Sequence, residues 1–285
     1  MLRGETVAGV DTEDLTIGRD ADLPVTRLEE TYRCHETVAD FLAEHVYRHD
    51  GISYRSAIDD TLDAVGETDA LEAVLDDTPL VLVLHEESAS QQVNPTEAEL
   101  TAAIAAGLDE VGVVTPHNAQ KGLLGSRLDD GTEVDTVERF QGGERESIVV
   151  SATASDPDFL EAERDFILNP NRLTVAMSRM QRKLVVVASK SVFEVVPPDT
   201  DGYERARLWK GLYEDLEVLD RDPEWHGTVR EFVGDECGVP GGDPESGTDT
   251  DEGSSAVATG VDGGIGVEVY SLDGVRSIEG DEHDG

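Results

Sequence analysis

Five short predicted strands, most of them apolar runs, alternate with segments of helical patterning and constrain the fold of this 285-residue chain more than any other feature. The strands occupy residues 80–84, 111–115, 134–137, 147–152 and 184–188. Apolar runs without polar alternation are typical of strands that are covered on both faces, as the strands of parallel sheets are. Helical patterning occupies residues 96–108, 119–128, 169–180 and 203–219. The sequence therefore predicts an α/β fold in which helices cover both faces of a parallel sheet.

The segment before the first apolar run carries weaker patterns. We expect residues 1–25 to be a loop or the remnant of an upstream region. A helix is predicted over residues 34–48 from its stripe of apolar side chains. Residues 50–78 are interpreted as an insertion that contains one short amphipathic helix around 71–75.

The end of the chain changes in composition. The domain is expected to span residues 26–220. From about Gly234 the apolar periodicity disappears and Gly, Asp, Glu and Ser dominate. A segment of this composition has little apolar surface to bury. Residues 221–285 are therefore predicted to be a largely disordered acidic tail, with at most a marginal hairpin over 265–278.

The charge balance is extreme, with 63 acidic residues against 22 basic ones and a formal net charge of −41. An acidic surface of this strength repels nucleic acid at low salt. Two interpretations are open. Either the protein never contacts nucleic acid, or it is adapted to a salty cytosol such as that of a halophilic archaeon, where the Debye length falls to about 3 Å at 1 M salt. Because the acidic residues are spread along the whole chain, we favour the halophilic interpretation and expect folding to require molar salt.

Cysteine usage and hydropathy bear on the compartment. Cys34 and Cys237 lie far apart in the sequence, so they indicate neither a disulfide framework nor a zinc site, and no metal-ligand set is predicted. The start of the chain lacks the apolar segment of a signal peptide, and no stretch approaches the ~18 apolar residues of a membrane span. We therefore expect a cytoplasmic protein without a membrane partner.

Four sequence blocks occur in a defined order: LEETYRCH over 28–35, VVTPHNAQ over 113–120, VDTVERFQGGE over 134–144 and NPNRLTVAMSR over 169–179. The last three resemble motifs IV, V and VI of the superfamily 1B helicases, the group that includes the nonsense-mediated-decay helicase and senataxin. The first resembles the Tyr-Arg segment that opens the same domain. The resemblance covers roughly residues 26–195. It implies the second RecA-like domain of an ATP-dependent nucleic-acid helicase.

The resemblance also implies a nucleotide site. Arg33 and Arg179 would reach the γ-phosphate of ATP as arginine fingers, a task that suits the forked guanidinium group. Tyr32 would stack on the adenine, and Glu144 would accept hydrogen bonds from the ribose hydroxyls. The loop after motif V would complete the cofactor-binding set with Gln141 and Gly142. The competing interpretation of Tyr32 is a core side chain.

The same resemblance implies a nucleic-acid track. Thr115, Gln120 and Thr136 would contact the nucleic-acid backbone at the ends of predicted strands. Arg172 is interpreted as a structural residue that pairs with neighbouring acids. The two histidines beside these motifs, His35 and His117, have no ligand partners at metal spacing and are interpreted as non-catalytic.

A phosphate-binding loop of the form GxxxxGK[ST] does not occur in the sequence, which contains no Gly-Lys pair. The ASKS segment over 188–191 lacks both glycines, and the acidic end of the first apolar run, 85–87, is interpreted as an exposed strand end. We therefore expect ATP and Mg²⁺ to be used only together with a first RecA-like lobe, encoded in the same gene or on a partner chain. Single-stranded DNA or RNA is the other expected partner.

Two further interpretations remain open on the sequence alone. One is a non-enzymatic module that keeps the fold and binds nucleic acid or a protein. The other is a truncated gene fragment without an independent role.

Overall fold

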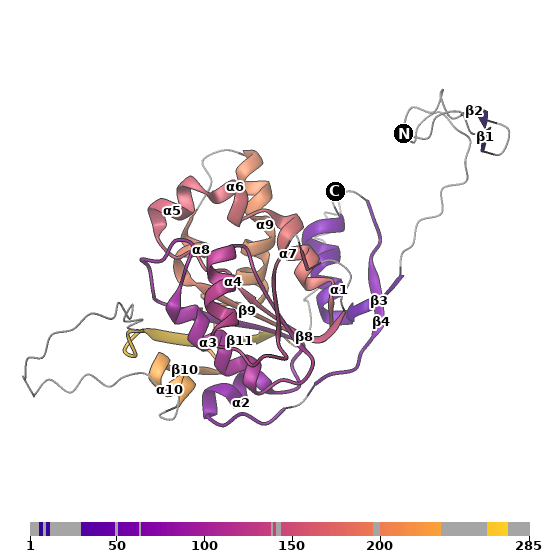
Figure 1. Cartoon of the computed structure of the whole chain (residues 1–285). Coiled ribbons are helices and arrows are strands. Elements are labelled where there is room, and N and C mark those ends of the chain that lie inside the picture. Colours follow the sequence, from indigo (N-terminus) through magenta and orange to yellow (C-terminus); the bar gives the residue numbers. More distant parts are fainter. Residues whose placement is uncertain are drawn as a thin grey trace, which may run out of the picture.

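A seven-stranded sheet forms the centre of the molecule, and helices cover both of its faces (Figure 1). The computed structural model describes residues 6–7, 10–11, 30–48, 51–62, 64–137, 139–140, 144–195, 200–234 and 261–272. The strand order is β10-β11-β5-β9-β8-β6-β7. The strands are β5 (Leu80–His85), β6 (Val111–Thr115), β7 (Glu133–Thr136), β8 (Arg145–Ser151), β9 (Met180–Ser189), β10 (Trp225–Thr228) and β11 (Gly266–Leu272).

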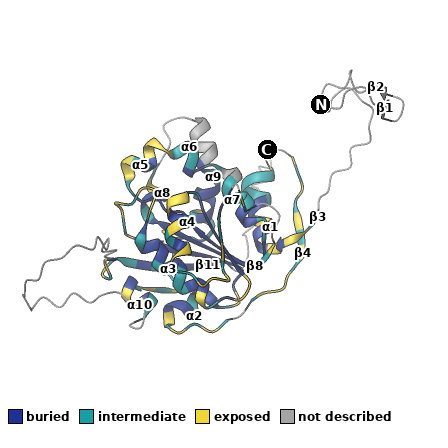
Figure 2. Cartoon of the chain, viewed as in Figure 1, coloured by how far each residue is buried: buried dark blue, intermediate teal, exposed yellow. Residues whose placement is uncertain are grey.

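The five strands from β5 to β9 pair in parallel, whereas β11 runs antiparallel to both β5 and β10. The predicted fold class, α/β with a mostly parallel sheet between two layers of helices, is confirmed. Each predicted apolar run forms a strand of this sheet. The strands are the most deeply buried part of the chain, as the dark blue centre of Figure 2 shows.

The helices lie close to the segments predicted from periodicity. They are α1 (Glu36–Leu42) with a π-helical continuation η1 (Ala43–Tyr47), α2 (Asp69–Leu75), α3 (Pro95–Ala106), α4 (Asn118–Gly125), α5 (Pro157–Ala162), α6 (Arg164–Ile167), α7 (Pro170–Met177), α8 (Lys190–Glu194), α9 (Thr200–Asp215) and α10 (Val229–Val233). The predicted helix over 203–219 ends earlier, at Asp215, and Glu217 adopts a positive φ of 51° that is incompatible with a continued right-handed helix. None of the described helices is long and apolar enough to cross a bilayer.

A two-stranded parallel sheet precedes the main body. It consists of β3 (Glu30–His35) and β4 (Arg55–Ile58). The helix predicted over 34–48 therefore starts two residues late, since β3 extends through His35. The predicted insertion over 50–78 contributes β4 and, as expected, the short helix α2. At the N-terminus, β1 (Thr6–Val7) pairs with β2 (Val10–Asp11), and the other residues of the predicted loop 1–25 lie outside the described residues.

The core consists of two hydrophobic layers, one on each face of the sheet. Alternation along β5 decides which layer each side chain joins: Leu80, Leu82 and Leu84 face one layer, and Val81 and Val83 face the other. Helices α1, α7 and α9 cover the first layer, and α2, α3 and α10 cover the second. Burying one Leu or Val side chain stabilises the folded chain by about 1.5–3 kcal/mol. Both layers contain many such side chains, so both contribute to the stability of the sheet.

The prediction of a disordered tail over 221–285 is wrong for residues 225–233 and 261–272. These residues form β10, α10 and β11, and β11 lies inside the sheet between β5 and β10. Of the marginal hairpin expected over 265–278, residues 266–272 form β11, which pairs on its two sides with β5 and β10, and residues 273–278 lie outside the described residues. The β11 side chains Val267 and Val269 are almost completely buried. Residues 235–260 and 273–285 lie outside the described residues.

Candidate nucleotide and nucleic-acid sites

The amino ends of β8 and β9 bring two predicted site residues together. Glu144 directly precedes β8, and Arg179 lies between the end of α7 and the start of β9. The two chain segments are joined where the backbone N–H of Arg145 donates to the carbonyl oxygen of Arg179 at 3.1 Å. Residues from motifs V and VI therefore lie side by side at this edge of the sheet.

Strand β3 adds Tyr32 and Arg33 to the same region. The strand is fixed just beyond them, because Cys34 is completely buried and its thiol lies 3.7 Å from the Tyr54 hydroxyl. Burial raises the pKa of Cys34 to about 11, so this thiol stays protonated and acts as a small core side chain. The hydroxyl of Ser56 in β4 donates to the carbonyl oxygen of Cys34 and ties the two strands together.

Arg33 and Glu144 form an ion pair, with the Arg33 Nε 3.4 Å from Glu144 Oε1. Gln181 at the start of β9 donates from Nε2 to the other carboxylate oxygen of Glu144 at 3.3 Å. The two members of the ion pair are 60% and 38% exposed, so the pair contributes about 1 kcal/mol or less to stability. A contact this weak can be exchanged for a ligand at low cost.

Tyr32 is 68% exposed, which excludes its interpretation as a core residue in this structure. An exposed tyrosine ring is a surface on which a planar ligand can stack. Tyr32 directly precedes Arg33 in β3, so Tyr32, Arg33 and Glu144 form one cluster of exposed residues, and their roles toward a nucleotide stay predictions.

Arg179 is half-buried and makes no side-chain hydrogen bond or ion pair with the part of the chain that the structure describes. Its Nε is fully shielded from solvent and has no acceptor. A buried donor on a charged group without a partner costs free energy, about 1–3 kcal/mol or more. Among the described residues no carboxylate pairs with this guanidinium group, so an external anion would satisfy it.

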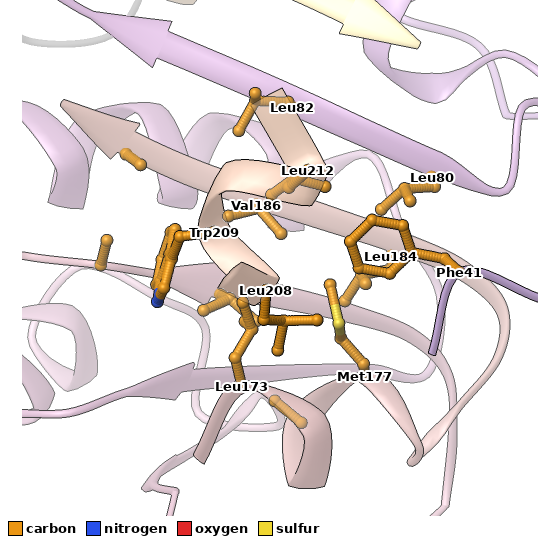
Figure 3. Packing of buried hydrophobic residues seen from close by; sticks show 14 of the residues in the cluster. Phe41, Leu80, Leu82, Leu173, Met177, Leu184, Val186, Leu208, Trp209 and Leu212 are labelled. Atoms are coloured by element: carbon orange, nitrogen blue, oxygen red, sulfur yellow. The ribbon is translucent and has the colours of Figure 1, made fainter. Parts of the chain in front are cut away.

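The backbone that carries Arg179 is held rigidly. Leu173 and Met177 of α7 point toward Leu208 of α9 and join it and Leu184 of β9 in one hydrophobic cluster, as Figure 3 shows. Met180, the first residue of β9, is completely buried on the other side of Arg179. The guanidinium group therefore projects from a fixed junction between a packed helix and a central strand.

The residues predicted to touch nucleic acid lie at the opposite, carboxyl edge of the parallel strands. Thr115 and Thr136 face each other in register at the ends of β6 and β7. All three predicted side chains are buried, with Thr115 and Gln120 at 0% exposure and Thr136 at 5%. In this structure the three side chains are not available to nucleic acid, because the protein's own polar groups and core surround them.

Gln120 and Thr115 are instead part of a buried hydrogen-bond network. Gln120 accepts from the backbone N–H of Asn94 at 2.8 Å and donates to the Asn94 carbonyl oxygen at 3.1 Å. The Thr115 hydroxyl lies 2.8 Å from that of Thr153, a residue with a strained positive φ of 73°. The network thus links α4 and β6 to the loops that cover this edge.

Glu97 of α3 is the centre of this network, and sequence reasoning did not single it out. Its carboxyl group is completely buried, accepts from the Ser151 hydroxyl at 2.6 Å and from the Thr153 N–H at 2.7 Å, and lies 3.1 Å from His85 Nε2. The Asn-Pro pair at the start of α3, with Asn94 as the N-cap, could be recognised in the sequence as a helix start. The burial of Glu97 could not be predicted, because a glutamate in the first turn of a helix is ordinarily exposed.

The remaining residues from the sequence analysis have structural roles or lie outside the described residues. Gln141 and Gly142 lie outside the described residues. Arg172 stacks on the Phe166 ring, with its guanidinium carbon 3.6 Å from the ring centroid. His35 caps α1 by accepting from the Thr37 N–H, and His117 stacks on Phe166 with centroids 5.4 Å apart.

The two segments that resemble parts of nucleotide-binding motifs, residues 188–191 and 85–87, form contacts within the protein. Lys190 pairs with Glu86 at 3.1 Å and with Glu268 of β11 at 2.8 Å, and Ser189 caps the short helix α8. Within the described residues there is no group of three or more His, Cys, Asp or Glu side chains that could hold a metal ion.

A family model described as AAA domain matches residues 15–191, which is more than half of the sequence. The chain belongs to this AAA domain family. The matched segment includes all four motif blocks and every parallel strand, whereas β10, α10 and β11 lie beyond it.

Similar curated proteins are consistent with a superfamily 1 helicase domain. DNA polymerase alpha-associated DNA helicase A of Saccharomyces cerevisiae is 36% identical over 91 residues, 30% of this chain and 13% of that protein. DNA-binding protein SMUBP-2 of Mus musculus is 28% identical over 183 residues, 57% of this chain and 18% of that protein. A regulator of nonsense transcripts 1 homolog of Arabidopsis thaliana is 28% identical over 156 residues, 48% and 11% respectively. The chain therefore contains a helicase-related domain that spans less than a fifth of each of these relatives.

Proposed function

We propose that this chain is the second RecA-like motor lobe of an ATP-dependent nucleic-acid helicase. The observation that carries the proposal is Arg179, an arginine on a rigid mount whose side chain has no partner among the described residues. It lies beside Glu144 and close to the strand that carries Arg33 and Tyr32, at one edge of the sheet. The helicase relatives and the order of the four motif blocks support the assignment.

The charges at this edge suit phosphoryl transfer. When ATP is hydrolysed, negative charge is distributed over the oxygens of the transferred phosphoryl group, and a fixed guanidinium stabilises that charge. Arg179 would serve as one such group and Arg33 as the second. Because Arg33 already contacts Glu144, nucleotide binding would exchange a weak, exposed ion pair for a charge-assisted contact to phosphate.

The nucleoside would be recognised by the exposed side chains of the cluster. The Tyr32 ring offers a stacking surface for a base, and the Glu144 carboxylate offers acceptors for ribose hydroxyls. Gln181 donates to Glu144 and would keep that carboxylate oriented when Arg33 turns to the phosphates.

ATP hydrolysis on this account needs a first lobe. The sequence has no phosphate-binding loop. A first RecA-like lobe would bring that loop and the Mg²⁺ site, and the lobe described here would close the nucleotide cleft from the other side.

The nucleoside contacts can be tested in an ATPase reconstituted from this chain and a matching first lobe, in high salt. We expect Tyr32→Ala and Glu144→Ala each to raise the KM for ATP about tenfold and to change kcat much less, because uniform binding contacts alter KM. The matched control is Glu146→Ala, two residues away, where the carboxylate pairs with Arg182 at 3.5 Å. Unchanged KM values in both variants, or a rise equal to that of the control, would show that the cluster does not hold the nucleoside.

A further inference from the structure

A groove with a volume of about 480 Å³ lies at the β10 edge of the sheet. α2, α10 and β10 meet there, in the lower part of the view in Figure 1. Residues 68–70 at the start of α2 line the groove together with Trp225 and His226 of β10 and Arg230 and Glu231 of α10. We call it the β10 groove. Because β10 and α10 lie beyond the segment that the family model matches, the family gives this groove no role.

Strand β10 has an open edge beside the groove, since β11 is its one neighbour among the described strands. The Val229 N–H donates to the Ile265 carbonyl oxygen at 2.9 Å, in the register of the β10–β11 pair. In an antiparallel pair, alternate residues direct N–H and C=O away from the partner strand, so His226 and Thr228 direct theirs to the open edge. The Thr228 N–H donates to Glu231 Oε2 at 2.7 Å. His226 is therefore the residue of β10 that offers both a main-chain donor and a main-chain acceptor at this edge.

The walls of the groove carry exposed charged side chains. Arg230 and Asp69 make no side-chain hydrogen bond or ion pair with the part of the chain that the structure describes. His226 is exposed as well. Glu231 differs, because the hydroxyl and the N–H of Thr228 donate to its carboxylate and hold the pKa of Glu231 below its usual value. The groove thus offers a cation and a carboxylate that are both available to a ligand.

Trp225 gives the groove an apolar wall. Its ring packs edge-on against Phe232, with centroids 5.7 Å apart and an interplanar angle of 75°. It also lies over Gly227, where an added Cβ would come within 2.6 Å of the indole. The half-buried ring is therefore held in one position, and its exposed part is a surface on which a ligand side chain can pack.

We propose that the β10 groove binds a peptide segment of a partner protein, which adds to the sheet as an extended strand beside β10. His226 would exchange two main-chain hydrogen bonds with one residue of the peptide, and an acidic side chain of the peptide would pair with Arg230. In strand addition of this kind, main-chain hydrogen bonds provide affinity and side-chain contacts provide specificity. This inference does not depend on the proposed motor function.

The same features favour a peptide over nucleic acid. The carboxylates of Asp69 and Glu231 would oppose a polyanion, whose binding depends on neutralising phosphates with basic side chains. A peptide main chain carries one donor and one acceptor per residue, which matches the pair of groups that His226 presents.

The test selects ligands for the full chain, in high salt, from a display library of random octapeptides. Selected peptides are then synthesised with a fluorescein label, and their binding is measured by anisotropy. We expect them to carry Asp or Glu and to bind about tenfold or more weakly to Arg230→Glu, because a charge-assisted hydrogen bond is lost. The matched control is Arg55→Glu, at another exposed arginine without a side-chain partner among the described residues, and it should change binding less than about twofold.

Modified peptides test the main-chain contacts without any change in the protein. N-methylation of alternate residues removes the N–H groups from one side of an extended peptide. We expect one set of positions to lose binding about tenfold or more and the other set to lose little, because only one side faces β10. Equal losses from both sets, equal effects of the two Glu variants, or no peptide selected above background would overturn the proposal. Displacement of the peptide by an oligothymidylate, weakened by Arg230→Glu, would assign the groove to nucleic acid and overturn it as well.

Discussion

Arg179→Ala is expected to lower the kcat of an ATPase reconstituted from this chain and a first lobe by about 10³–10⁵-fold, the range typical of arginine fingers. The reason is that the guanidinium would act on charge that develops in the transition state, so kcat and kcat/KM should fall together. Arg179→Lys should retain little of the kcat, because the lysine ammonium group lacks the planar, forked donor geometry of a guanidinium group. The measurement is steady-state ATP hydrolysis in high salt with single-stranded nucleic acid.

Arg172→Ala serves as the internal control for this loss. Arg172 lies on α7, the helix that directly precedes Arg179, but it stacks on Phe166, so its removal should affect stability more than rate. Arg33→Ala is expected to reduce kcat sharply as well, since the resemblance gives it the same role. If the Arg33/Arg179 double variant, well folded and mixed with the first lobe, hydrolyses ATP as fast as the unmodified chain, the arginine-finger assignment is wrong.

Val269→Asp in β11 is expected to destabilise the domain by more than about 4 kcal/mol, the range of a buried unpaired charge. Val269 is completely buried and lies opposite Val83 of β5. Since domains are stable by only about 5–15 kcal/mol, such a loss would leave much of the protein unfolded at moderate temperature. Urea denaturation followed by circular dichroism in high salt measures the change.

The control for β11 is the same substitution at an exposed valine. Val65 is 90% exposed, and Val65→Asp should change the free energy of unfolding by no more than about 0.5 kcal/mol. Equal stability of the two variants would mean that β11 contributes nothing to the sheet and that residues 261–272 behave as the sequence alone suggested.

The parallel strands were predictable because a strand that is buried on both faces has apolar residues at successive positions. The run LVLVL over 80–84 has this form, and it became a central strand. Helices with clear apolar periodicity, such as α3, were predictable for the same kind of reason.

The strands β3, β10 and β11 could not be predicted in the same way. β3 reads ETYRCH, with mostly exposed polar residues, and β10 has only four residues. β11 is apolar at alternate positions, but it lies in a segment rich in Gly and Asp, and its partner β5 is nearly two hundred residues away. One element of this region does have a recognisable sequence pattern, because Thr228 and Glu231 form a capping box at the start of α10.

The candidate nucleotide site was more predictable than the nucleic-acid contacts. The resemblance assigns Arg33 and Glu144 to one nucleotide site, and the structure joins the two side chains in an ion pair, whereas their roles toward a nucleotide stay predictions. The motif did not predict that Thr115 and Gln120 are buried, because their burial depends on packing by residues distant in sequence, such as Asn94 and Glu97. Sequence motifs identify which residues belong to a site, whereas the packing around them decides which ones can touch a ligand.

The most direct test of the motor-lobe assignment is the rate of ATP hydrolysis by this chain and a first RecA-like lobe, each alone and mixed, in high salt with single-stranded nucleic acid. Our account predicts that this chain alone hydrolyses no ATP above background, since its sequence has no phosphate-binding loop. It predicts that the mixture hydrolyses ATP faster than the sum of its parts and that nucleic acid stimulates the rate. Robust hydrolysis by this chain alone, or no stimulation by any first lobe from the same genome, would contradict it.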